Sequence, residues 1–220
     1  MNWLAHVFLS ENHIEHQLGN LLTDPLKGKA WEGASTRIHA GIKMHMRIDS
    51  FTDTHPLVSQ SKAILTPRGH LKGVVLDILY DHFLSLHWDR FCSIEREHFL
   101  DDFRFRALES IGGYPSEAQR VILRVVGNQQ LSSYLHMDGV VDAFQRLDNR
   151  LSERARSKDN CTRYIPLIAQ NREELEANFL CFFPELMEAV KNNCHRMDVV
   201  HWKIEAYGNV YNLLSDIELT

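Results

Sequence analysis

The chain has 220 residues, which is enough for one domain or for one domain with an appended subdomain. Hydrophobic residues make up 44% of it, charged residues make up 24%, and the mean hydropathy is −0.29, all ordinary values for a soluble globular protein. No run of 18 apolar residues occurs, and the first residues lack the basic region and cleavage site of a signal peptide. We therefore expect a cytoplasmic protein that binds neither a membrane nor nucleic acid.

The net charge of −5 is distributed unevenly along the chain. Residues 26–74 carry eight basic and only three acidic side chains, so this segment has a local charge of +5. A positive region on an acidic protein favours an anionic partner. The simpler explanation of this segment's charge is that it forms a mixed, solvated surface with no binding role. The four cysteines form no C-x-x-C pair, so we expect free, buried thiols in a reducing compartment.

Helices joined by short loops account for the whole pattern of apolar residues. We expect them at about residues 2–22, 34–50, 56–65, 71–91, 94–111, 116–126, 138–156 and 172–197, with a further helix near 199–214. Pro25, Pro67 and the pair Gly112-Gly113 mark breaks between them. No convincing strand and no repeat is found. The predicted fold is therefore all-α, a compact helical bundle in a single domain over 1–220, with the chemistry in 1–92 and a helical remainder in 93–220.

Nine of the thirteen histidines and six aspartates fall within the first ninety residues. Asp77 and Asp81 are the pair hardest to explain without a cation, because they stack at i and i+4 on an otherwise apolar helix. His82 can reach the same place from its edge, and mixed oxygen and imidazole ligands suit Mn²⁺, Mg²⁺, Fe²⁺ or Zn²⁺. The alternative is that Asp77 pairs with an arginine and Asp81 caps a neighbouring helix.

His45 and Asp49 are also spaced at i and i+4, as a metal ligand and its carboxylate partner would be. A neutral core histidine bonded to Asp49 is the competing interpretation, and His6 alone would also be a core histidine. Asp24 stands at the end of a helix, where the helix dipole is unfavourable for an anion and a cation would compensate it. An Asx-turn before Pro25 explains Asp24 equally well.

Five blocks of residues occur in one order over about the first ninety residues. They are Asn2-Trp3-Leu4-Ala5-His6; Gly19-Asn20-Leu21-Leu22-x-Asp24-x-x-Lys27-Gly28; Gly41-Ile42-x-Met44-His45-x-Arg47-Ile48-Asp49; Phe51-Thr52-Asp53-x-x-Pro56; and Leu76-Asp77-x-x-x-Asp81-His82-Phe83-Leu84-x-x-His87-Trp88. Together they resemble the acyl carrier protein phosphodiesterase family, a relative of the HD-type metal phosphohydrolases. The adjacent pair here reads Asp81-His82, the reverse of the usual His-Asp order.

The resemblance implies an HD-phosphohydrolase-like helical enzyme that uses a divalent metal, with Mn²⁺ expected and Mg²⁺ or Fe²⁺ as alternatives. It implies hydrolysis of the phosphodiester that joins 4′-phosphopantetheine to a serine of acyl carrier protein. Products would be apo acyl carrier protein and free 4′-phosphopantetheine. The basic segment would then face this small, acidic protein substrate.

The predicted site combines the residues and the resemblance. The expected metal ligands are His6, Asp24, His45, Asp77, Asp81 and His82. The expected catalytic residues are Asp24, His45, Arg47, Asp77 and Asp81, and the expected substrate-binding residues are Lys27, Arg47 and Arg68. Asp49 and Asp53 are expected to support the ligands, although Asp53 is favoured as a helix N-cap. Two other functions stay open: an HD-like phosphohydrolase acting on a nucleotide, and a non-catalytic helical module that binds an acidic partner.

Overall fold

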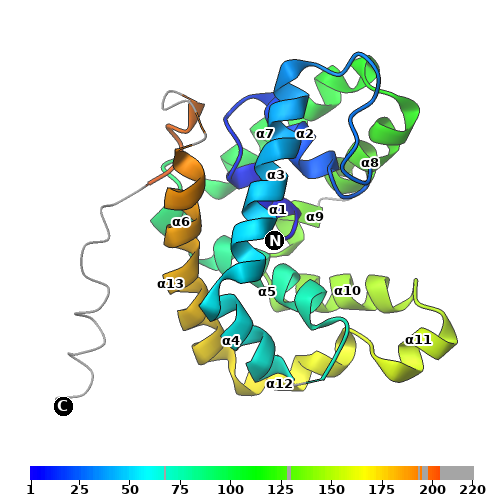
Figure 1. Ribbon diagram of the computed structural model, residues 1–220, viewed down its shortest axis with the longest axis vertical. Helices are drawn as coiled ribbons and strands as arrows, with labels where there is room; N and C mark the ends of the chain where they lie inside the picture. Colours follow the sequence, from blue (N-terminus) through cyan, green and yellow to red (C-terminus); the bar gives the residue numbers. More distant parts are fainter. Residues whose placement is uncertain (67, 128–129, 193, 195–197, 204–220) are drawn as a thin grey trace.

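The computed structural model describes residues 1–66, 68–127, 130–192, 194 and 198–203. Its helices are α1 (Trp3–Phe8), α2 (Ile14–Leu22), α3 (Thr36–Thr54), α4 (Pro56–Leu65), α5 (Lys72–Leu86), α6 (Trp88–Phe91), α7 (Arg96–Ser110), α8 (Ser116–Gly127), α9 (Gln130–Ser133), α10 (Met137–Asp148), α11 (Glu153–Lys158), α12 (Ile165–Gln170) and α13 (Arg172–Lys191), with short 3-10 turns η1 (Ile111–Gly113) and η2 (Thr162–Tyr164). Among these residues the only β-pairing is a single bridge between Cys92 and Trp202, so the all-α expectation is confirmed (Figure 1). None of these helices combines the length and apolar character needed to cross a bilayer.

Three of the expected helices are divided in the structure. The helix expected over 2–22 is wrong, because the chain turns at Ser10 and runs back as α2. The Ser10 hydroxyl donates to the carbonyl of His6 and accepts from the Asn20 amide, which holds this turn together. The expected helix over 71–91 is interrupted between α5 and α6, and that over 138–156 is split where Ser152 caps α11. Residues 199–203 are not helical, and the remainder of the helix expected near 199–214 lies outside the described residues.

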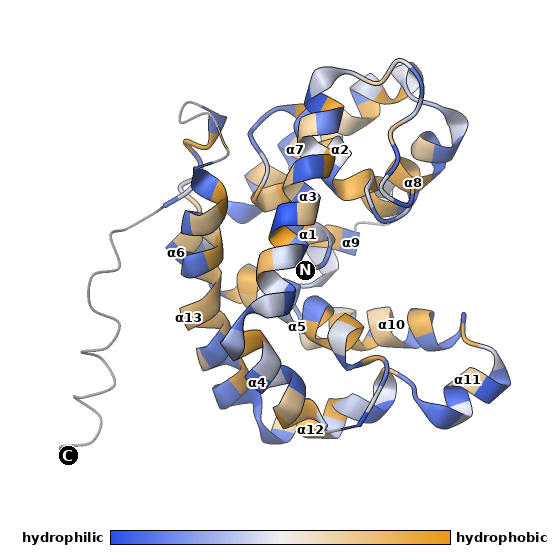
Figure 2. Cartoon of the chain, in the orientation of Figure 1, coloured by the Kyte–Doolittle hydropathy of each residue, from blue (hydrophilic) through white to orange (hydrophobic). Residues whose placement is uncertain are grey.

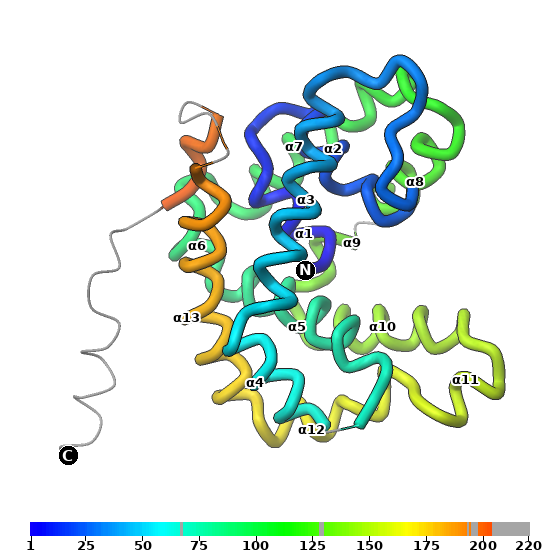
Figure 3. The backbone as a smooth tube through the Cα atoms, viewed as in Figure 1, coloured from blue at the N-terminus to red at the C-terminus, as the bar shows by residue number. Residues whose placement is uncertain are grey.

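Two long helices, α3 and α13, lie side by side and organise the molecule (Figure 3). Helix α2 packs against α3 and also contacts α7 and α8, and α1 packs against α2 and α5. Helix α4, which follows α3, packs against α13 and α12, and α10 packs against α5. The amino terminus therefore lies in the interior between these two groups of helices (Figure 1).

An aromatic core fills the space between α1, α5 and α13. Phe8, Phe83, Phe179 and Phe183 are all fully buried, and their rings contact one another or common neighbours. Apolar residues are accordingly dense along α13, whereas α11 is mainly hydrophilic (Figure 2). Beyond α13 the chain returns to this core, where the Trp202 indole donates a hydrogen bond to the carbonyl of Phe8 at 2.9 Å.

The closest helix contact in the site region is the crossing of α2 and α3 at Gly19 and Gly41. A Cβ placed on Gly41 would lie 2.8 Å from the Asn20 nitrogen and 3.0 Å from the Gly19 Cα, and still closer to the His16 carbonyl. One on Gly19 would lie 3.0 Å from the Ile38 Cα. These atoms are backbone and cannot move independently, so only glycine permits this approach. The crossing brings Asn20 next to the central turns of α3.

We predict that Gly41→Ala lowers the free energy of unfolding by about 3 kcal/mol, because the added methyl group must separate two packed backbones. Urea denaturation followed by circular dichroism measures the change. Gly112→Ala is the matched control, since a Cβ there meets nothing within 4 Å, and it should change stability by no more than about 0.5 kcal/mol. Equal stability of the two variants would contradict the proposed crossing.

Candidate metal centre

His45 is presented from the middle of α3 with its ring orientation fixed by the backbone of α2. The side chain is 4% exposed, and its Nδ1 lies 2.9 Å from the carbonyl oxygen of Asn20. A carbonyl oxygen only accepts, so Nδ1 carries a proton and donates it. Nε2 is therefore directed at two carboxylates, Asp49 at 2.9 Å and Asp24 at 3.1 Å.

His6 on α1 lies parallel to His45, with ring centroids 4.0 Å apart and planes 11° apart. Its Nδ1 is 2.8 Å from the side-chain oxygen of Asn20. The amide nitrogen of Asn20 donates to the His6 carbonyl and to the Ser10 hydroxyl, so the amide oxygen is left to accept from Nδ1. Nε2 of His6 then faces the Met1 carbonyl at 3.1 Å and Asp49 at 3.3 Å.

Asn20 thus fixes the orientation of both imidazoles. Its backbone carbonyl accepts from His45, and its side-chain oxygen accepts from His6. The residue is fully buried, and every one of these bonds is internal to the protein. An imidazole that ligates a metal usually donates its other N–H to such an acceptor, which fixes the tautomer and the ring plane. Both histidines have this arrangement, with Nε2 left to face the cluster.

The two histidines of the cluster differ in their protonation near pH 7. Burial lowers the pKa of His6 to about 4, so this ring is neutral near pH 7. Burial would also lower the pKa of His45, but hydrogen bonds to Asp24 and Asp49 outweigh it and raise the value to about 9. Burial opposes ionisation of Asp49 as well, yet the hydrogen bond from protonated His45 and the charge of the Met1 ammonium hold its pKa far below the usual range.

The donor set fits a divalent ion. His6, His45 and Asp49 each offer one ligand atom, and the three atoms lie within 4.8 Å of one another. Neutral His6 presents a lone pair, not a proton, to the Met1 carbonyl and to Asp49, so acceptors face acceptors there. A cation bound among these atoms would remove that conflict, and two imidazoles with carboxylate oxygen suit Mn²⁺, Fe²⁺ or Zn²⁺. Asp24 lies outside this group of three, with its carboxylate 3.1 Å from Nε2 of His45.

A cleft of about 280 Å³ lies next to the cluster, although His6, His45 and Asp49 are not among the residues that line it. Met1 and Asp24, which contact the histidines, also line this cleft, and Asp77 lines it next to them. Its other walls come from α5 and α10, with Tyr134 behind them. The two histidines are therefore buried, and their neighbours Asp24 and Met1 form the contact between the cluster and the cleft.

Comparison with known proteins gives a family match over most of the chain. The family model described as acyl carrier protein phosphodiesterase matches residues 1–186. The chain belongs to this family. Relatives named acyl carrier protein phosphodiesterase are each 30% identical: one from Yersinia pestis over 196 residues, 87% of this chain and 98% of the relative; and one from Escherichia coli O6:H1 over 193 residues, 86% and 96%.

The family that the sequence motifs indicated is thus confirmed, and with it an enzyme of the acyl carrier protein phosphodiesterase class. A relative from Photorhabdus laumondii with the same name is 30% identical over 197 residues, 87% of this chain and 96% of the relative. No solved structure matches the chain significantly. The expected likeness to HD-type phosphohydrolases stays a prediction.

Of the six expected metal ligands, the structure brings His6, His45 and Asp24 together. Asp49, which we expected only to support them, faces both histidines and belongs to the cluster itself. Asp77 lies at the cleft, where its partner is the Met1 ammonium at 3.3 Å. The carboxylate at position 77 therefore has the cation that its apolar surroundings require, although that cation is not an arginine.

Asp81 and His82 do not join the cluster. The two carboxylate oxygens of Asp81 accept from the backbone nitrogens of Leu4 and Ala5, at 2.9 and 3.0 Å, so this residue caps the start of α1. Burial raises its pKa to about 7, and the two N–H groups oppose that shift. His82 is buried elsewhere, with Nδ1 at 2.8 Å from the Tyr134 carbonyl. The alternative of a helix-capping Asp81 is thus the one observed.

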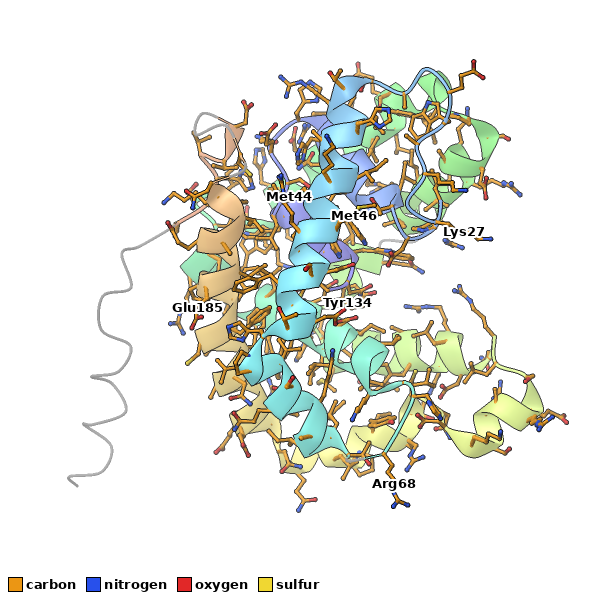
Figure 4. All side chains as sticks on the ribbon, in the orientation of Figure 1. Lys27, Met44, Met46, Arg68, Tyr134 and Glu185 are labelled. Carbon is orange, nitrogen blue, oxygen red and sulfur yellow. The ribbon has the colours of Figure 1, made fainter. Side chains whose placement is uncertain are left out.

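The expected substrate-binding cations are not gathered at one place. Arg47 is exposed and, being two residues from His45 on one helix, points to the opposite side of α3. Lys27 follows Asp24 in the turn after α2, whereas Arg68 lies on the far side of the molecule (Figure 4). Asp53 is also exposed and pairs with Lys62 at 3.1 Å, away from the cluster. It is therefore neither a support for the ligands nor the cap of α4, which is His55.

Two functional groups were not anticipated from the sequence. Asn20 appeared in the motifs without a role, and its place beside Gly19 in the second block is the signal that could have identified it. The backbone of Met1 contributes a carbonyl to His6 and an ammonium to Asp49 and Asp77. A pattern of side chains in the sequence cannot predict that a backbone group takes part in a site.

We predict that Mn²⁺ affinity rises about tenfold for each pH unit between pH 6.5 and 8, because the ion must displace the proton from Nε2 of His45. His6 and Asp49 are already deprotonated in this range, so one proton leaves per ion. The slope disappears as the pH passes about 9, where His45 loses its proton without the ion. Isothermal titration calorimetry in buffers of different ionisation enthalpy measures both the affinity for Mn²⁺ and the number of protons released per ion.

Asp53→Asn is the control for this titration, since Asp53 lies outside the cluster, and it should bind Mn²⁺ with the same affinity and slope. His45→Ala and Asp49→Ala should each bind at least a hundredfold more weakly. An affinity that is independent of pH, or retained without both His45 and Asp49, would show that the ion binds elsewhere.

Proposed function

We propose that this protein is a metal-dependent phosphodiesterase that removes 4′-phosphopantetheine from holo acyl carrier protein. The observation that supports it is the His6, His45 and Asp49 cluster, which contacts the cleft through Asp24 and Met1, in a member of this family. Relatives with about the same length carry the name of this activity. The products are the apo carrier protein and free 4′-phosphopantetheine.

The protein's own residues hold the reacting groups in this scheme. His6, His45, Asp49 and Asp24 hold the divalent ion, for which we propose Mn²⁺, with Mg²⁺ or Fe²⁺ as alternatives. When bound, the ion supplies Lewis acidity that activates water near neutral pH and screens phosphoryl charge. Asn20 keeps the imidazole planes fixed, so little reorganisation is needed when substrate arrives.

The bond changes are those of phosphodiester hydrolysis. The oxygen of a water molecule forms a bond to phosphorus, and the bond from phosphorus to the serine oxygen of the carrier protein breaks. The serine oxygen leaves with a proton, which restores the hydroxyl of the apo protein. Asp24 is the most exposed carboxylate of the cluster, so it is the one placed to meet a water that enters along the cleft.

Recognition of an acidic carrier protein is supported by exposed basic residues in the turn after α2, beside Asp24, and on the side of α3 that faces away from His45. Lys27, Lys29, Lys43 and Arg47 are exposed, and none of them pairs with an acid in the part of the chain that the structure describes. Lys27 lies three residues after Asp24, so the positive rim begins at the cleft itself. Unpaired cations at a rim attract and orient an acidic partner more than they add to its affinity.

We also propose that the protein acts in the cytoplasm. Its four cysteines, Cys92, Cys161, Cys181 and Cys194, are all free thiols in the structure. Burial raises the pKa of each of them, so they stay protonated and unreactive near pH 7. Free thiols of this kind are typical of a reducing compartment.

The test is incubation of holo acyl carrier protein with the enzyme and Mn²⁺, followed by mass spectrometry of the carrier protein. We predict the loss of the whole prosthetic group, as free 4′-phosphopantetheine, and inhibition by a chelator. His45→Ala and Asp49→Ala should lower kcat by at least about a thousandfold, because each removes a group that holds the ion.

Asp53→Asn serves as the control and should retain wild-type kcat. Circular dichroism must show the same helical content in every variant, so that loss of activity is not loss of fold. Retained activity in both His45→Ala and Asp49→Ala would contradict the assignment of the site. An intact prosthetic group after treatment with the wild-type enzyme would contradict the proposed reaction.

A further inference from the structure

One wall of the cleft carries two arginines that the proposed metal centre does not use. Arg146 lies in the last turn of α10, and Arg150 follows the end of this helix. Both line the cleft together with Ala143 and Leu147. This spacing of three and four residues puts all four on one face, turned toward Asp77 on α5 and toward Asp24.

Neither guanidinium group has a counter-ion among the residues that the structure describes. Both side chains are exposed, and neither forms an ion pair or a side-chain hydrogen bond within the described residues. Arg146 is close enough to Tyr134 to lower its pKa, while burial raises that pKa to about 12. Two like charges on one helical face repel each other, so an anion between them would be stabilised by both.

The opposite end of the same cleft is anionic. Asp24 and Asp77 line it, and Asp49 lies just behind them, against one ammonium from Met1. A phosphodiester carries a negative charge and would be repelled by these carboxylates alone. The arginine wall supplies positive charge at the place where a substrate anion must enter.

We infer that Arg146 and Arg150 bind the non-bridging oxygens of the substrate phosphodiester and position it against the metal centre. The inference rests on the proposed function, because it names the residues that hold the phosphate of that same substrate. Guanidinium groups suit this role, since their planar donors pair with two phosphate oxygens at once. The arginines are positioning residues and take no proton in the reaction.

The remaining wall of the cleft matches the neutral part of the same substrate. Val74 and Ile78 on α5 and Leu147 on α10 are apolar, and Val74 is 41% exposed although it is a large aliphatic side chain. The pantetheine arm is uncharged and extended, so it would lie against this surface while its phosphate meets the arginines. Apolar contact of this kind holds the arm without adding charge.

A purely structural role for Arg146 makes a different prediction. A cation in the last turn of a helix interacts favourably with the helix dipole, and Arg146 occupies that turn of α10. Loss of this interaction would reduce stability slightly and would leave phosphate binding unchanged. Binding measurements therefore separate the two roles.

The test measures binding of inorganic phosphate and of free 4′-phosphopantetheine to the full chain by calorimetry, with and without Mn²⁺. Arg146→Gln and Arg150→Gln should each weaken both ligands roughly tenfold or more, and the double variant should weaken them further. With holo acyl carrier protein, KM should rise more than kcat falls. Arg146→Lys should recover only part of the affinity, because lysine keeps the charge and loses the planar pair of donors.

Arg120→Gln is the matched control, since Arg120 is an exposed arginine on α8 outside the cleft. It should bind phosphate as the wild type does. Wild-type phosphate affinity in the Arg146→Gln, Arg150→Gln double variant would overturn the inference, as would a wild-type protein that binds neither ligand. If the wild type binds both ligands through these arginines but leaves holo acyl carrier protein intact, the proposed function fails and the anion site stands.

Discussion

The close crossing of α2 and α3 at Gly19 and Gly41 is the constraint on which the candidate site depends. A methyl group at either position would meet backbone atoms, so the two helices approach as nearly as backbones can. Asn20 follows Gly19 directly, and its carbonyl lies 2.9 Å from His45 on α3 only because of this approach. The same residue holds His6 from α1, so three helices share one buried hydrogen-bonding residue.

The capacity of the site to bind a cation follows from the Nε2 atoms that this arrangement directs at carboxylates. Both imidazoles have their Nδ1 atoms occupied by Asn20, and both direct Nε2 at Asp49. Without an ion, His45 is protonated and shares its proton with two carboxylates, whereas neutral His6 has no proton to give. His6, His45 and Asp49 would hold a divalent cation in place of that single proton, and His6 would then also have a partner. The adjacent cleft, which Asp24 and Met1 line, is where we propose that the substrate binds.

The sequence predicted the fold class and the family, and it named His6, His45 and Asp24, which the structure brings together. The other contacts of the candidate site could not be predicted, for physical reasons. His45 and Asp49 could be paired because helical spacing is local, and Asp24 because a carboxylate at a helix end needs a partner. Asp81 was assigned as a ligand because the sequence cannot show that α1, 76 and 77 positions away, offers two N–H groups to it. Arg146 and Arg150 lie more than one hundred residues from His45, and only the packing of α10 on α5 brings them to the cleft. The turn at Ser10 could not be predicted either, because it depends on a hydrogen bond from Asn20, which is ten residues away in the chain.

The central claim is that His6, His45 and Asp49 hold one divalent ion. Anomalous diffraction at the manganese absorption edge, from crystals grown with Mn²⁺, tests it most directly, because it locates the ion independently of activity. We predict one strong peak within about 2.3 Å of Nε2 of both histidines and of an Asp49 oxygen, with Asp24 as the next nearest carboxylate. A peak between Asp77 and Asp81, or no peak near the two histidines, would contradict it.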